Sequence, residues 1–120
     1  MYRLAIEELY EWKKSANRKP LIIEGARQVG KTWLMKEFGK KFYEKCAYIN
    51  LDDNSRMNRL FDEDFDLARI IQGLKIESGV NIEPENTLII LDEIQETPKA
   101  LKALKYFCEN ANDYHIISAG

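Results

Sequence analysis

The chain has 120 residues, a length that allows at most one domain. Its hydrophobic content of 45% is ordinary for a globular protein, and its formal net charge of −2 gives no electrostatic footprint for nucleic acid. No apolar run approaches the roughly 20 residues that a membrane span needs, and the N-terminus lacks a signal-peptide pattern. Cys46 and Cys108 match no metal spacing and are expected to be reduced, buried thiols.

The first elements along the chain are a predicted helix and a predicted strand. Apolar residues recur at helical spacing over residues 2–16, with charged residues between them, which indicates a one-sided helix. The segment N-R-K-P at residues 17–20 ends this helix. A short apolar run at residues 21–24 then predicts the first strand. We expect residues 1–17 to form an N-terminal helix and residues 21–120 to form a core domain.

Residues 25–32, G-A-R-Q-V-G-K-T, match the phosphate-binding loop G-x-x-x-x-G-K-T. Gly25 and Gly30 allow the backbone to approach a ligand closely, and the loop amides converge at a helix N-terminus that favours an anion. Lys31 is expected to reach the β- and γ-phosphates, and the Thr32 hydroxyl to bind Mg²⁺. The other residues expected to bind nucleotide are Ala26, Arg27, Gln28, Val29 and Trp33. A tight turn of chance spacing is the alternative, which the flanking strand and helix disfavour.

The middle of the chain predicts two helices, a strand and a long connection. A helix over residues 33–45 carries an apolar stripe, and residues 47–51 read as the second strand. Residues 52–66 contain six acids without EF-hand spacing, so we interpret them as a solvated connection with helix-capping acids, pinned to the core by Phe61 and Phe65. Residues 66–78 predict a helix that ends at Gly79, followed by a turn over residues 81–86.

The last third of the chain predicts two strands around a helix. The unbroken apolar run at residues 87–91 is typical of a strand covered on both faces. Thr97 and Pro98 are placed as N-cap and first residue of a helix whose body spans residues 100–112. Residues 114–119 predict the last strand. Alternating helices and strands call for an α/β fold, in which helices cover both faces of a parallel sheet.

Two acids follow the third strand at the edge of the sheet where ligands bind. Asp92 is placed to hold Mg²⁺, and Glu93 to polarise a water molecule for attack on the γ-phosphate. The alternative is that this Asp-Glu pair only opens a loop. Simple nucleotide kinases usually lack the second carboxylate, so the pair favours hydrolysis. Arg27 has two open roles, a phosphate contact or an ion pair with Glu24. Gln95 either orients water or caps the next helix, and capping is favoured.

The loop G-A-R-Q-V-G-K-T, taken with Leu91-Asp92-Glu93-Ile94-Gln95, resembles the AAA-type ATP-binding proteins of bacteria and archaea. This resemblance covers nearly the whole chain. It implies a three-layer P-loop fold of the additional-strand type, with sheet order 5-1-4-3-2 and strand five beyond Gly120. It also implies a C-terminal domain beyond residue 120 and a polar sensor at the end of strand four, for which the candidates are Ser118 and a residue just past Gly120. The chain then represents a C-terminally incomplete ATPase domain.

These observations lead to one hypothesis with two alternatives. We expect a cytoplasmic, Mg²⁺-dependent ATPase that releases ADP, with Glu93 and Lys31 as catalytic residues and Thr32 and Asp92 as metal ligands. The alternatives are a nucleotide-dependent switch with negligible turnover and a P-loop kinase acting on a small molecule. GTP is disfavoured because no [NT]-K-x-D motif occurs. The family implies work inside a larger protein, with a protein partner or a second copy of the chain.

Overall fold

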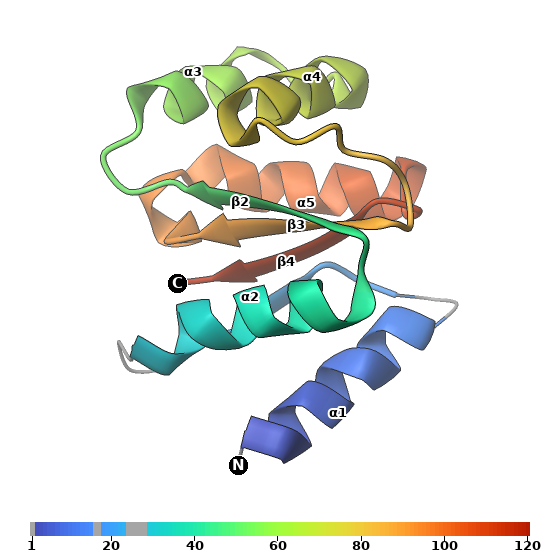
Figure 1. Cartoon of the computed structure of the whole chain (residues 1–120). Helices are drawn as coiled ribbons and strands as arrows, with labels where there is room; N and C mark the ends of the chain where they lie inside the picture. Colours follow the sequence, from blue (N-terminus) through green and yellow to red (C-terminus); the bar gives the residue numbers. More distant parts are fainter. Residues whose placement is uncertain (1, 16–17, 24–28) are drawn as a thin grey trace.

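Four parallel strands form the centre of the structure (Figure 1). The computed structural model describes residues 2–15, 18–23 and 29–120. The strands are β1 (Leu21–Ile23), β2 (Lys45–Asn50), β3 (Thr87–Asp92) and β4 (His115–Ala119). They pair in the order β1-β4-β3-β2, and every pairing is parallel. This confirms the α/β class and the order implied by the family resemblance for these four strands.

Helices cover both faces of this sheet (Figure 1). One face carries α1 (Tyr2–Lys14) and α2 (Val29–Phe42). The other carries α3 (Ser55–Glu63), α4 (Leu67–Ser78) and α5 (Pro98–Asn110), and a single 3-10 turn, η1 (Ile94–Glu96), links β3 to α5. Among the described residues, no helix is both long and apolar enough to cross a membrane. The arrangement is the expected three-layer α/β/α sandwich.

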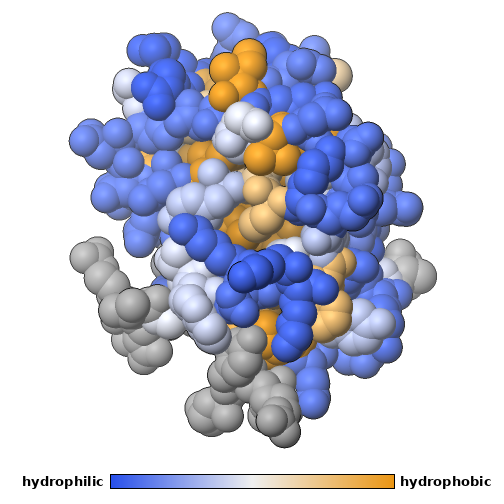
Figure 2. All heavy atoms as spheres, viewed as in Figure 1, coloured by the Kyte–Doolittle hydropathy of each residue, from blue (hydrophilic) through white to orange (hydrophobic). Residues whose placement is uncertain are grey.

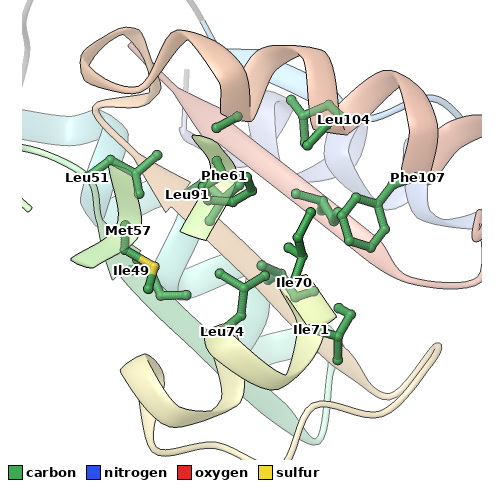
Figure 3. Packing of buried hydrophobic residues seen from close by; sticks show 14 of the residues in the cluster. Ile49, Leu51, Met57, Phe61, Ile70, Ile71, Leu74, Leu91, Leu104 and Phe107 are labelled. Atoms are coloured by element: carbon green, nitrogen blue, oxygen red, sulfur yellow. The ribbon is translucent and has the colours of Figure 1, made fainter. Parts of the chain in front are cut away.

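β3, one of the two inner strands, is buried along its whole length, and its side chains alternate between two cores. Ile89 and Leu91 join the cluster under α3, α4 and α5, where Figure 3 shows Phe61 and Phe107 converging on the sheet. Leu88 and Ile90 join the cluster under α1 and α2. Because strand side chains alternate with period two, the next residue on the α2 side is Asp92. The face seen in Figure 2 is hydrophilic around its margin, with apolar atoms visible in the middle.

The prediction of a loop over residues 52–66 is wrong, because residues 55–63 form α3. Asn54 caps this helix, its side-chain oxygen accepting the Met57 N–H at 3.1 Å. Met57 and Phe61 lie one turn apart and are both buried in the core. The acids of the segment point away from that core. The apolar stripe of this helix has only a few residues, too few for its periodicity to stand out among the charged ones.

The predicted ends of α4 and the predicted start of α5 are confirmed. Asp66 caps α4 by accepting the Arg69 N–H, and Gly79 ends α4 in the left-handed region at φ 72°, donating its N–H to Lys75. Thr97 and Pro98 begin α5 as expected, although the buried Thr97 hydroxyl makes no capping bond. Cys46 and Cys108 are free thiols, but each is half-buried rather than buried.

A buried histidine links β4 to the α1–α2 side of the sheet. His115 is buried, and its Nδ1 lies 2.5 Å from the Tyr43 hydroxyl. The Trp12 ring meets the His115 ring edge-on, with their centroids 6.1 Å apart. The pKa of His115 is lowered from 6.5 to about 4, chiefly by burial and then by the positive charges of Arg18 and Lys13, with Asp113 opposing the shift. The folded protein therefore keeps this imidazole neutral at pH 7.

We predict that His115 makes the fold sensitive to acid. Between about pH 4 and 6.5 the unfolded chain binds a proton on His115 that the folded chain does not, so the free energy of unfolding falls as pH falls through this window. The slope is at most about 1.4 kcal/mol per pH unit. Urea denaturation across the window checks this, with His115→Gln as the non-titrating comparison. The variant should show a flatter profile, and parallel profiles would contradict the assignment.

Candidate functional site

The candidate site forms where the start of α2 meets the end of β3. The Thr32 hydroxyl, in the first turn of α2, donates to Asp92 Oδ2 at 2.6 Å although 60 residues separate the two in sequence. Asp92 is the last residue of β3 and is only 5% exposed. The structure thus brings together the two predicted metal ligands, one from the phosphate-binding motif and one from the acidic pair.

A tyrosine that the sequence analysis did not single out completes the surroundings of Asp92. The Tyr48 hydroxyl, from β2, donates to the same Asp92 Oδ2 at 2.7 Å. The other carboxylate oxygen, Oδ1, accepts the Glu93 backbone N–H at 3.0 Å. Burial, followed by the hydrogen bond to Asp92, raises the pKa of Tyr48 above its ordinary value of 10.0, so the phenol stays a donor at neutral pH. The sequence signal for Tyr48 was its place in a strand next to β3, two residues before the strand ends.

The donors at this point fit a magnesium ion. Mg²⁺ prefers oxygen ligands and in phosphoryl-transfer sites is held by one or two carboxylates together with substrate phosphates. The Thr32 hydroxyl and the Asp92 carboxylate are such oxygens, and they lie within 2.6 Å of each other. Within residues 2–15, 18–23 and 29–120, no group of three or more His, Cys, Asp or Glu side chains is arranged to hold a metal. Thr32 and Asp92 therefore fit a metal ion that is bound jointly by these two residues and by a phosphate group.

Glu93 adopts an unusual backbone conformation beside this pair. Its φ of 58° and ψ of 47° lie in the left-handed region, which a residue with a Cβ adopts at a cost of about 1–2 kcal/mol. Its Oε1 accepts the Gln95 side-chain amide at 2.7 Å. Gln95 therefore does not take the capping role favoured from the sequence, and it holds the Glu93 carboxylate instead. Strain of this kind gathers at functional sites.

The structure describes some, but not all, of the other residues predicted to bind nucleotide. Gly30 and Lys31 lie in the first turn of α2 beside Thr32, and a Cβ added at Gly30 would meet no atom of the described residues within 4 Å. Trp33 follows on α2 and is 51% exposed. Val29 begins α2, whereas Gly25, Ala26, Arg27 and Gln28 lie outside the described residues, as does the choice between a phosphate contact and an ion pair for Arg27.

Ser118 is placed away from the Thr32–Asp92 pair. It is fully buried, and its hydroxyl has no hydrogen-bond partner among the described residues. In register it lies beside Leu91, whose side chain packs into the core under α3, α4 and α5. Because neighbouring strands in register present side chains to the same face, Ser118 faces the side opposite Asp92. The structure therefore does not bring this predicted sensor to the other site residues.

Comparison with known proteins gives one match. A family model described as "AAA domain" matches residues 17–120. No curated protein and no solved structure matches the chain. The matched range contains the phosphate-binding motif, all four strands and the acidic pair at the end of β3.

We predict that the backbone strain at Glu93 can be measured as stability. Glu93→Gly and Glu93→Ala both remove the carboxylate, but only alanine keeps the Cβ that strains a left-handed residue. The glycine variant should be more stable than the alanine variant by about 1 kcal/mol in chemical denaturation. The same two substitutions at Glu96, within η1, provide the control and should give the reverse order. An alanine variant at position 93 as stable as the glycine variant would refute the strain.

Proposed function

The chain belongs to the AAA domain family, and on that premise we propose that it binds ATP with Mg²⁺ and hydrolyses it to ADP and phosphate. The observation that carries this proposal is the hydrogen bond between Thr32 and Asp92. It joins a hydroxyl from the phosphate-binding motif to a buried carboxylate at the end of a parallel strand, where nucleotides bind in open α/β sheets.

Each residue of the site has a role in the proposed reaction. Lys31 and the amides of residues 25–30 bind the phosphates, and Thr32 and Asp92 would hold Mg²⁺. When bound, Mg²⁺ supplies positive charge that neutralises the phosphate oxygens. Glu93, which follows Asp92 in the chain and accepts a hydrogen bond from Gln95, would act as the general base.

The chemical step transfers the γ-phosphoryl group to water. The water oxygen forms a bond to the γ-phosphorus while the bond from that phosphorus to the β–γ bridging oxygen breaks and ADP leaves. Glu93 accepts the proton that the attacking water loses. General-base assistance of this kind accelerates a reaction by roughly 10²–10⁴-fold.

The same proposal includes a setting for the activity. ATP is abundant in the cytoplasm, and we assign the protein to that compartment. We expect hydrolysis to drive conformational work in a larger protein, with a C-terminal domain beyond residue 120, and with a protein partner or a second copy of the chain as its target.

Lys31→Ala tests nucleotide binding. Loss of the ammonium group removes charge-assisted hydrogen bonds to the phosphates, and ATP affinity measured by calorimetry should fall by roughly 10- to 100-fold or more. Lys40→Ala is the matched control, because it removes an exposed lysine from the same helix about two and a half turns away. Unchanged affinity in Lys31→Ala would refute the loop assignment.

Glu93→Gln tests hydrolysis separately from binding. The amide cannot accept the proton of water, so phosphate release should fall at least about 100-fold while ATP affinity stays within about twofold. Glu96→Gln, a nearby acid exposed to solvent, should leave both quantities unchanged. Slow phosphate release that survives Glu93→Gln would favour a nucleotide-dependent switch. A phosphorylated small molecule without free phosphate would instead identify a kinase.

A further inference from the structure

The Tyr48 hydroxyl lies where it can control the orientation of Asp92. Tyr48 is in register with Ile90, on the strand next to β3, and its side chain is packed against the cluster under α1 and α2. That face of the sheet also carries Asp92, two residues beyond Ile90. The phenol therefore reaches diagonally along the sheet, and its oxygen lies 2.7 Å from Asp92 Oδ2.

Three donors from three different places hold the Asp92 carboxylate. Thr32 of α2 and Tyr48 of β2 both donate to Oδ2, and the Glu93 backbone donates to Oδ1. Rotation of the carboxylate would break all three hydrogen bonds. If Tyr48 lost its hydroxyl, Thr32 would be the only one of these donors left on Oδ2, and Thr32 is itself a proposed metal ligand.

The Tyr48 ring is held by the same helix that supplies Thr32. The Lys36 ammonium lies 4.1 Å from the centroid of this ring, a distance at which the positive charge is attracted to the aromatic face. Lys36 and Thr32 lie one helical turn apart on α2, so they point to the same side of that helix. One face of α2 thus contacts both Asp92 and the tyrosine that holds it.

We infer that Tyr48 is a positioning residue that holds Asp92 in the orientation needed to bind the nucleotide-associated metal ion. This inference rests on the proposed Mg²⁺-dependent function. In this role the Tyr48 hydroxyl acts through Asp92, to which it donates its hydrogen bond. Partners of metal ligands that orient them in this way typically change metal affinity 10- to 100-fold when removed.

The test is Tyr48→Phe, which deletes the hydroxyl and keeps the packed ring. Binding of Mn²⁺ in the presence of ADP, followed by electron paramagnetic resonance, should weaken about 10- to 100-fold. ADP affinity measured without metal should stay unchanged. Tyr43→Phe is the matched control, because it removes another tyrosine hydroxyl from the same apolar cluster, one that contacts His115 instead of Asp92. Its Mn²⁺ affinity should match that of the unsubstituted protein.

Each outcome bears on one of the two proposals. Mn²⁺ affinity of Tyr48→Phe within about twofold of the unsubstituted protein overturns the positioning role and leaves the proposed function intact. If the unsubstituted protein binds no Mn²⁺ with ADP, the proposed function fails and the inference fails with it.

Should Tyr48→Phe not fold, fluorine NMR of 3-fluorotyrosine in the unsubstituted protein replaces it. The resonance of position 48 should then shift on adding Mg²⁺ to the ADP-bound protein, and an unmoved resonance overturns the inference.

Discussion

The hydrogen bond between Thr32 and Asp92 is the contact on which the candidate site depends. It requires that a helix start and a strand end, far apart in the chain, arrive at the same edge of the sheet. β4 lies between β1 and β3, and Thr32 reaches the end of β3 because α2 packs over β2, β3 and β4. The sheet order therefore positions the candidate site.

The two faces of the sheet have separate tasks. The α3–α5 face holds the larger apolar cluster and stabilises the fold, and it buries Ser118 without assigning it a polar partner among the described residues. The α1–α2 face carries the Thr32, Tyr48 and Asp92 side chains at its edge. Strand alternation produces this division, because residues next to each other in β3 and β4 point to opposite faces.

The chain changes direction immediately after Asp92. β3 is buried on both faces, whereas α5, the next helix, covers only the face opposite α2. Glu93 makes this turn in the left-handed region, and the 3-10 turn η1 follows it. Glu93, which adopts this strained conformation, is also the proposed base. The turn gives the two neighbouring carboxylates different surroundings. Asp92 accepts hydrogen bonds from three donors, and Glu93 accepts one from the Gln95 amide.

The sequence by itself predicted the four strands, the helices other than α3, and Thr32 and Asp92 as candidate metal ligands, because strand patterns and motif spacing are local signals. It missed α3, whose short apolar stripe of Met57 and Phe61 is surrounded by acids. Only the tertiary structure decided that Tyr48 donates to Asp92, that Gln95 holds Glu93 and that Ser118 faces the other side. Those facts depend on strand register and on which face each side chain takes. Register is set by contacts between distant segments, and no local pattern carries it.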